Sequence, residues 1–331
     1  MALGVRRLTS AQPAPGGLSG LTVRAADPHD VRVSDAGPTF PAAHPYLRVP
    51  RPFVLAHRGL ALAVPENSMP AFEAAVRAGV THVETDVRAT ADGVLVAFHD
   101  DRLERLTELE GPIAGVRWAD LRGAGLRGGT PVPLLADVLS AWPALRVNVD
   151  LKADGAVAPF VELVRATRAA DRVCTASFSE RRRRAAVRGL AGCGTPGHSL
   201  GFSASARFVA LAAAGAPVRV LRRALAGAIA LQLPDHAGPM PVVTGRLVRA
   251  AHAAGAQVHV WTVDEPARMG ELLALGVDAL VTNRADLALP LTGAVGGVAP
   301  GSDAGSDAGS HADIDADIDA DIDADIDRER W

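Results

Sequence analysis

Two histidines stand where apolar segments end and polar turns begin. His57 closes the run FVLA and His99 closes the run VLVAF, borders at which a buried structural histidine is unusual. Imidazoles titrate near neutral pH, so two of them can act as general base and general acid on opposite sides of a phosphorus atom. We interpret His57 and His99 as candidate catalytic residues. The remaining histidines of the central region are interpreted as surface or packing residues: His82, His198, His236, His252 and His259.

Three carboxylates also stand at the ends of apolar segments. Glu84 and Asp86 are two residues apart, so on one strand they face the same side and repel each other unless a positive group lies between them. A divalent cation meets that need, and Asp150 would complete an all-oxygen site for Mg²⁺ or Ca²⁺. The competing interpretation is that each acid caps a helix or pairs with Lys or Arg.

Two cationic residues follow the same segment ends. Arg58 would hold the non-bridging oxygens of a phosphate group by its planar fork, and Lys152 would hold them as a point charge. Trp261 ends a further apolar run, QVHVW, and we assign it to the substrate site.

The order of the segments predicts the elements that position these residues. Eight runs are candidate strands: 53–56, 81–86, 146–151, 172–177, 197–201, 228–233, 257–262 and 279–282. Helix-period stretches lie between most of them, among them 68–78, with Ser68 as N-cap, and 244–254, ending at Gly255. This alternation predicts parallel strands that close into a TIM (β/α)8 barrel, with an open doubly wound sheet as the competitor. Functional residues of such barrels stand at the carboxyl ends of the strands.

One apolar run does not fit the alternation. Residues 94–98 follow Asp92-Gly93 with no room for a helix, so residues 85–98 are predicted to form a β-hairpin extension after the second strand. That hairpin would place His99 over the mouth of the barrel.

Composition divides the chain into three parts. Residues 1–47 are predicted to be a flexible Pro-rich leader and residues 48–292 the catalytic barrel. Residues 293–331 begin with Gly and Ser and continue as an Asp-rich repeat with too much charge to bury, so we expect a disordered acidic tail of unknown partner.

The charge of the chain suits an anionic small molecule. The net charge is −3, but the tail is strongly acidic, so the rest of the chain is mildly basic. Aromatic residues do not interleave with the basic ones, which argues against nucleic-acid binding. The run from Arg181 to Arg184 is interpreted as the solvated start of a helix rather than a phosphate-binding patch.

Cysteine usage and hydropathy bear on location. Cys174 and Cys193 form neither a disulfide framework nor a metal-binding spacing, which favours a reducing, cytoplasmic compartment. Because no run of about 18 apolar residues occurs, we expect no membrane insertion.

Several short motifs follow one another in this chain. HRG at His57 is followed by PEN, ETD, a T-x-DG turn and an HD that ends at Asp100, and later by VNVDLK and WTVD. In this order they resemble the signature of the glycerophosphodiester phosphodiesterase family. The resemblance implies a TIM barrel and metal-dependent hydrolysis of glycerophosphodiesters to sn-glycerol 3-phosphate and an alcohol. It implies that His57 and His99 are an acid/base pair. It implies that Glu84 and Asp86 are metal ligands, and that Arg58 and Lys152 contact the phosphate.

The resemblance also assigns supporting roles and shows departures. Glu66 of PEN would hydrogen-bond the histidine-bearing loop, and Asn67 would act as a cap. Asp150 replaces the family's usual Glu, so this shorter ligand is expected to reach the metal through a water molecule. Asn283 stands where the last strand usually has Asp, and Leu106 interrupts the motif that follows HD.

Two alternatives to this function stay open. One is a related barrel phosphodiesterase that acts on intact phospholipid head groups. The other is a weakened, non-catalytic barrel that binds phosphodiesters or a partner, with the acidic tail as its contact.

Overall fold

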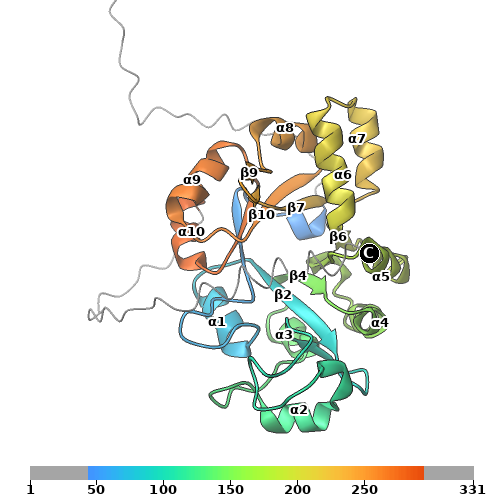
Figure 1. The fold of residues 1–331 in the computed structure, drawn as a ribbon, viewed down its shortest axis with the longest axis vertical. Coiled ribbons are helices and arrows are strands. Elements are labelled where there is room, and N and C mark those ends of the chain that lie inside the picture. Colours follow the sequence, from blue (N-terminus) through green and yellow to red (C-terminus); the bar gives the residue numbers. More distant parts are fainter. Residues whose placement is uncertain (1–43, 294–331) are drawn as a thin grey trace, which may run out of the picture. The chain divides into compact units, whose positions relative to one another are not determined.

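The computed structural model describes residues 44–293, which contain eight parallel strands in a nearly closed barrel (Figure 1). Around the barrel the order is β6, β5, β4, β2, β1, β11, β10, β7, and a parallel bridge between Ser199 and Ala230 joins the two edges. The predicted barrel and its eight strands are confirmed, and the open sheet is excluded. The strands are β1 (Phe53–Ala56), β2 (His82–Ala89), β4 (Arg146–Leu151), β5 (Val173–Ala176), β6 (Gly197–His198), β7 (Ala230–Pro234), β10 (Gln257–Trp261) and β11 (Ala279–Thr282).

Helices connect the strands and pack around the barrel. Ser68 Oγ accepts the Ala71 N–H at the start of α1, and Gly255, with φ of 93°, ends α8, so both predicted helix borders are confirmed. The α-helices are α1 (Met69–Arg77), α2 (Trp118–Ala124), α3 (Leu135–Ala141), α4 (Val157–Thr167), α5 (Glu180–Gly189), α6 (Phe202–Ala213), α7 (Val218–Leu225), α8 (Gly245–Ala254), α9 (Pro266–Ala274) and α10 (Ala285–Leu291). Short 3₁₀ turns are η1 (Pro45–Leu47), η2 (Ile113–Gly115), η3 (Asp154–Ala156) and η4 (Ala170–Arg172), and a small hairpin pairs β8 (His236–Ala237) with β9 (Met240–Pro241).

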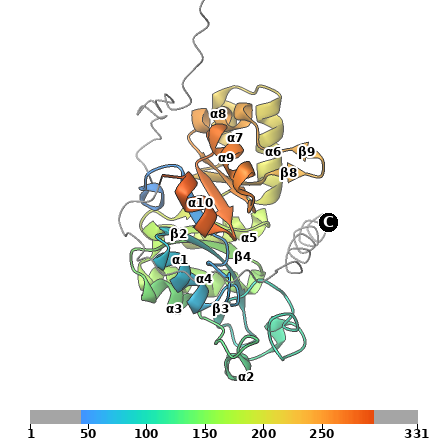
Figure 2. The same cartoon turned by 90° about the vertical axis from the view of Figure 1, so that its left-hand side faces the viewer.

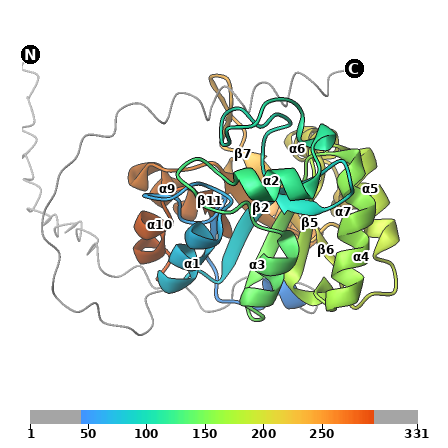
Figure 3. The ribbon, with the colours of Figure 1, turned by 90° about the horizontal axis from the view of Figure 1, so that it is seen from below.

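The predicted hairpin extension is present. Strand β3 (Leu95–Ala97) pairs antiparallel with residues 87–89 of β2. The segment that follows includes α2, which stands out from the barrel at the bottom of Figure 2 and lies in front of it in Figure 3. This segment has its own apolar core, made of Val96, Phe98, Leu103, Ile113, Leu121, Leu126 and Val132. The core anchors the chain on both sides of His99.

The arginine run lies at the start of α5, as predicted, but it is not wholly solvated. Arg181 and Arg184 are exposed, whereas Arg183 is only 2% exposed. Its guanidinium donates to Glu180 and lies 2.8 Å from His198 Nδ1, which satisfies the buried charge.

Turn η1 packs against the amino-terminal end of the barrel. Tyr46 is fully buried with its ring edge on His82, and the His82 ring stacks on Phe53 with 4.3 Å between centroids. The folded part therefore begins before residue 48. Other parts of the predicted leader and tail, residues 1–43 and 294–331, lie outside the described residues.

The longest of the described helices, α6, has 12 residues, whereas a helix that spans a membrane needs about 20. Between residues 44 and 293, none is both long and apolar enough to cross a bilayer.

Acid should destabilise this fold through its buried histidines. Burial lowers the pKa of His82 to about 3 and that of His259 to about 4, whereas an exposed histidine has a pKa of about 6.5. The unfolded chain thus binds more protons in this interval, so the free energy of unfolding is full above about pH 6.5 and decreases as the pH falls toward 4. Each histidine contributes at most about 1.4 kcal/mol per pH unit.

Urea unfolding at about pH 7.5 and about pH 5 measures this loss. His259→Gln should reduce the difference between the two pH values, and His236→Gln, at an exposed position, should leave it as it is. An unchanged difference in His259→Gln would contradict the explanation.

Candidate active site

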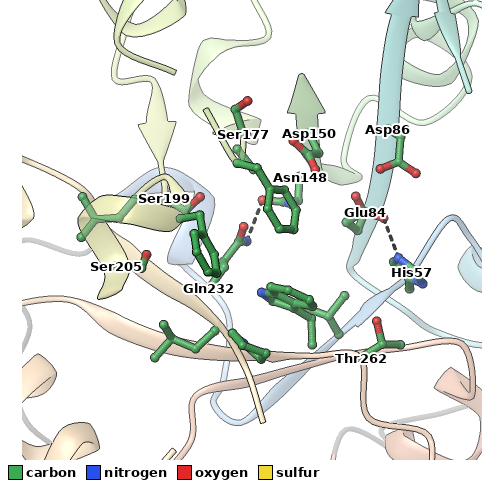
Figure 4. Close-up of a pocket in the computed structure, with 18 of the residues that line it drawn as sticks. His57, Glu84, Asp86, Asn148, Asp150, Ser177, Ser199, Ser205, Gln232 and Thr262 are labelled. Atoms are coloured by element: carbon green, nitrogen blue, oxygen red, sulfur yellow. Dashed lines mark hydrogen bonds and ion pairs between the residues drawn. The ribbon is translucent and has the colours of Figure 1, made fainter. Parts of the chain in front are cut away.

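One pocket of about 360 Å³ opens at the carboxyl ends of the barrel strands (Figure 4). That volume suits a small molecule. All eight residues that the sequence assigned to catalysis, metal binding or substrate binding line it: His57, Arg58, Glu84, Asp86, His99, Asp150, Lys152 and Trp261. The structure therefore brings the predicted set together around one cavity.

A tight turn after β1 aims Arg58 into the pocket. Arg58 and Gly59 both have left-handed backbone, with φ of 54° and 88°. A Cβ on Gly59 would lie 2.7 Å from the carbonyl carbon of Ala71 in α1, so only glycine allows the helix to approach this closely.

The orientation of His57 is set by a fixed amide. His57 Nδ1 lies 2.8 Å from Asn283 Oδ1, and Asn283 Nδ2 donates to Asp264 Oδ2 at 2.8 Å. Because a carboxylate only accepts, the amide oxygen must face His57, and the proton must lie on Nδ1. His57 Nε2, 3.9 Å from Glu84 Oε2, then presents its lone pair to the pocket. Burial, and then the charge of Arg58, lower the pKa of His57 to about 4, which keeps the ring neutral near pH 7.

His99 rests on a carboxylate instead. Its Nδ1 lies 2.8 Å from Asp100 Oδ1, and Arg105 donates to both Asp100 oxygens at 2.7 and 2.9 Å. Burial would raise the pKa of Asp100, but hydrogen bonds from His99 and Arg105 hold it well below its usual range. The ionised carboxylate accepts the Nδ1–H of His99 and so orients the ring.

The carboxylates of β2 and β4 are interleaved with cations. Lys152 Nζ lies 3.3 Å from Asp86 Oδ1 and 3.0 Å from Asp150 Oδ2, and Arg58 Nε lies 3.0 Å from Asp86 Oδ2. Burial alone would raise the pKa of Asp86, yet Lys152 and Arg58 hold it well below its usual range. Burial, and then the charge of Asp86, raise the pKa of Glu84.

The three predicted metal ligands share the pocket without converging as a preformed cluster. Within residues 44–293, no group of three His, Cys, Asp or Glu side chains has the arrangement of a metal site. Asp86 and Asp150 do pair with cations, Asp86 with Arg58 and Lys152 and Asp150 with Lys152, which is the contact that the competing interpretation expects. Even so, Asp150 Oδ1 is buried with no hydrogen-bond partner, and Glu84 remains destabilised as an anion. This surplus of oxygen ligands fits a divalent cation.

Residues 57–287 match the model of the Glycerophosphoryl diester phosphodiesterase family. The chain belongs to this family. Among curated proteins it is 42% identical over 243 residues to "Probable glycerophosphodiester phosphodiesterase 2" of Mycobacterium tuberculosis, an alignment that covers 73% of this chain and 91% of the relative.

Solved structures share the fold. A glycerophosphodiester phosphodiesterase from Agrobacterium tumefaciens aligns with a TM-score of 0.59 and 24% identity, over 72% of this chain and 99% of the other. A phosphodiesterase from Oleispira antarctica, in complex with the product sn-glycerol-3-phosphate, aligns with a TM-score of 0.59 and 21% identity, over 73% and 96%. At these identities the likeness establishes the barrel.

Glu66 and Asn67, the PEN residues of the family motif, lie behind the pocket. Glu66 Oε1 accepts from Arg58 Nη1 at 3.0 Å and from Arg105 Nη2 at 2.7 Å, so it joins the loops that carry the two histidines, in line with the expected hydrogen bond. The predicted capping role of Asn67 is wrong, because Ser68 caps α1. Asn67 Nδ2 instead donates to Asp86 Oδ2 at 3.0 Å and orients that carboxylate.

Asn283, which stands where the family usually has Asp, still contacts His57. Its amide oxygen accepts the hydrogen bond from His57 Nδ1 that a carboxylate would accept. Sequence reasoning missed its partner Asp264 as a support for the site. It also missed a hydrogen bond across the pocket, from Gln232 Nε2 to Asn148 Oδ1 at 2.8 Å. Asn148 was detectable as a polar residue two positions before Asp150 on the same strand, and therefore on the same face.

The protonation pattern of His57 can be tested without any reaction. In ¹⁵N NMR spectra near pH 7, His57 should show a protonated Nδ1 and an unprotonated Nε2, because Asp264 fixes the Asn283 amide. Asp264→Ala releases that amide, so the variant should show a mixture of tautomers. Asp286→Ala, which removes a carboxylate that pairs with Arg284 on the surface, should leave the spectrum unchanged. An Nε2-protonated ring in the unaltered protein would contradict the assignment.

Proposed function

We propose that this protein hydrolyses glycerophosphodiesters to sn-glycerol 3-phosphate and an alcohol, with a divalent cation bound beside the phosphate. The observation that carries the proposal is the unlike pair of histidines in one pocket. His57 is held by an amide oxygen and His99 by a carboxylate. A neutral imidazole accepts a proton and a charged imidazole donates one, which are the two proton transfers that hydrolysis of a phosphodiester needs.

The residues divide the reaction between them. His57 Nε2 takes a proton from a water molecule as the water oxygen forms a bond to phosphorus. The bond from phosphorus to the alcohol oxygen breaks, and His99 Nε2 donates its proton to that oxygen. Arg58 and Lys152 hold the non-bridging oxygens, and Trp261 forms a wall of the substrate site.

The carboxylates would hold the cation. Glu84, Asp86 and Asp150 provide oxygen ligands of the kind that Mg²⁺ and Ca²⁺ prefer. A cation bound there would withdraw negative charge from a phosphoryl oxygen. The shorter Asp150 leaves room for a bridging water, which suits Mg²⁺ in particular.

The relatives support this reaction. The Mycobacterium tuberculosis protein carries the name of a glycerophosphodiester phosphodiesterase, and the Oleispira antarctica structure contains sn-glycerol-3-phosphate. The alternative of a non-catalytic barrel is less well supported, since both histidines and all three carboxylates line the pocket. We also propose a cytoplasmic location, because Cys174 and Cys193 are both free thiols, the first of them buried.

His57→Ala and His99→Ala should both lower turnover, but the two variants should differ in how their activity depends on the leaving group. His57→Ala and His99→Ala should each lower kcat by about 10² to 10⁴-fold, the range for a lost general catalyst. A diester whose leaving group is p-nitrophenol needs no protonation to depart, so it should restore much of the activity of His99→Ala and little of that of His57→Ala.

The control is His252→Ala, which removes a histidine that pairs with Asp278 outside the pocket. It should retain its activity toward both substrates. Near-normal turnover of an unactivated glycerophosphodiester by either pocket variant would refute the acid/base assignment.

A further inference from the structure

The charges in the pocket are confined to one side. Figure 4 shows His57, Glu84 and Asp86 on one side and Ser199, Ser205 and Gln232 on the other. Every charged or histidine side chain that lines the pocket belongs to residues 57–152, and among the lining residues from Ala176 onward none is charged. The uncharged side, called the apolar arm below, is lined by the apolar side chains Phe178, Leu200, Phe202, Val209, Leu233 and Val242, together with the uncharged polar residues Ser177, Ser199, Ser205 and Gln232.

Helix α6 leaves an apolar stripe open to this arm. Phe202, Ala206 and Ala210 are spaced four residues apart, so they share one face of the helix, and all three line the pocket. Phe202 is 38% exposed, and both alanines are exposed as well. The small alanine side chains leave space beside the helix. Water in that space would make few hydrogen bonds with the apolar side chains around it, so its replacement by an apolar group is favourable.

The arm does not suit a charged alcohol. No lining residue there offers a counter-charge, so a cationic or anionic group would lose hydration without compensation. The aromatic rings do not reverse this for a cation, because Lys152 Nζ already lies 5.2 Å from the centre of the Phe178 ring and would repel a second positive group.

We infer that one alcohol of the phosphodiester substrate carries a hydrocarbon chain, and that this chain lies in the apolar arm while the phosphate lies among Arg58 and Lys152. The inference rests on the proposed function and narrows it to diesters with an apolar substituent. The chain can belong to the alcohol that is released or to the glycerol that keeps the phosphate. In both cases a hydrocarbon chain would be buried in the apolar arm, and the two substrate series below distinguish the two positions of the chain.

The first series consists of esters of sn-glycerol 3-phosphate with methanol, butanol, hexanol and octanol, each used below its micelle concentration. The second series carries acyl chains of matching lengths on the glycerol and keeps methanol as the other alcohol. Each buried methylene is worth about fourfold in affinity, so kcat/KM should rise by at least about tenfold from the shortest to the longest chain in one series. The gain should appear in KM, because the chain is buried equally in ground state and transition state.

Variants of α6 locate the effect. Ala206→Trp and Ala210→Trp fill the arm, so each should reduce the ratio of long-chain to short-chain kcat/KM by at least about fivefold. Ala213→Trp makes the same change at an exposed position of α6 that does not line the pocket, and should keep the ratio of the unaltered protein. Thermal melting identifies any variant that does not fold. The two substrate series are measured on the unaltered protein, so they test the inference even if a variant does not fold.

The outcomes separate the two proposals. If the methyl ester is cleaved but kcat/KM is flat or falls with chain length in both series, the inference is overturned and the proposed function stands. If the unaltered protein with Mg²⁺ or Ca²⁺ cleaves no ester, the proposed function fails. Calorimetric binding to His99→Ala of the methyl ester and of the longest member of each series then decides the inference alone: tighter binding of either chain-bearing ester supports it, and equal binding of all three overturns it.

Discussion

Burial of several carboxylates at the mouth of the barrel is the constraint on which the rest of the site depends. Asp86 and Asp150 are register partners on β2 and β4, and Glu84 lies on the same face two residues earlier. All three are buried, so their mutual repulsion is weakly screened and must be offset by positive groups. Lys152 lies between the two aspartates, and Arg58 reaches Asp86 because the turn after β1 is left-handed.

A chain of charged residues also links Arg58 to His99, one of the two proposed acid/base histidines. Arg58 binds Glu66, Glu66 binds Arg105, and Arg105 binds Asp100, on which His99 rests. His57 is supported separately, by the side-chain amide of Asn283, which carries no net charge.

Much of this arrangement could be predicted from the sequence, because it depends on local patterns. Buried parallel strands produce short apolar runs, and a polar residue that follows such a run must lie at the carboxyl end of the barrel. Contacts between distant loops could not be predicted in this way. The link from Asp264 to Asn283 joins the segments after β10 and β11. The burial of Arg183 on α5 depends on its contact with His198 on β6. Asn67 and Ser68 are both capping types, and only the left-handed backbone of Asn67 shows which one caps.

The apolar arm was beyond sequence reasoning for a similar reason, since its walls come from β7, from α6 and from the loops after β5, β6 and β9, and each segment alone resembles ordinary barrel packing. The central proposal is that Glu84, Asp86 and Asp150 hold a divalent cation. Calorimetric titration of Mg²⁺ and Ca²⁺ into the unaltered protein, Asp150→Asn and Asp150→Glu tests it most directly. If these carboxylates hold the cation, Asp150→Asn should raise its Kd by at least about tenfold, about 1.4 kcal/mol, and Asp150→Glu should bind it at least as tightly as the unaltered protein. An unchanged Kd in Asp150→Asn, or no cation binding by the unaltered protein, would contradict it.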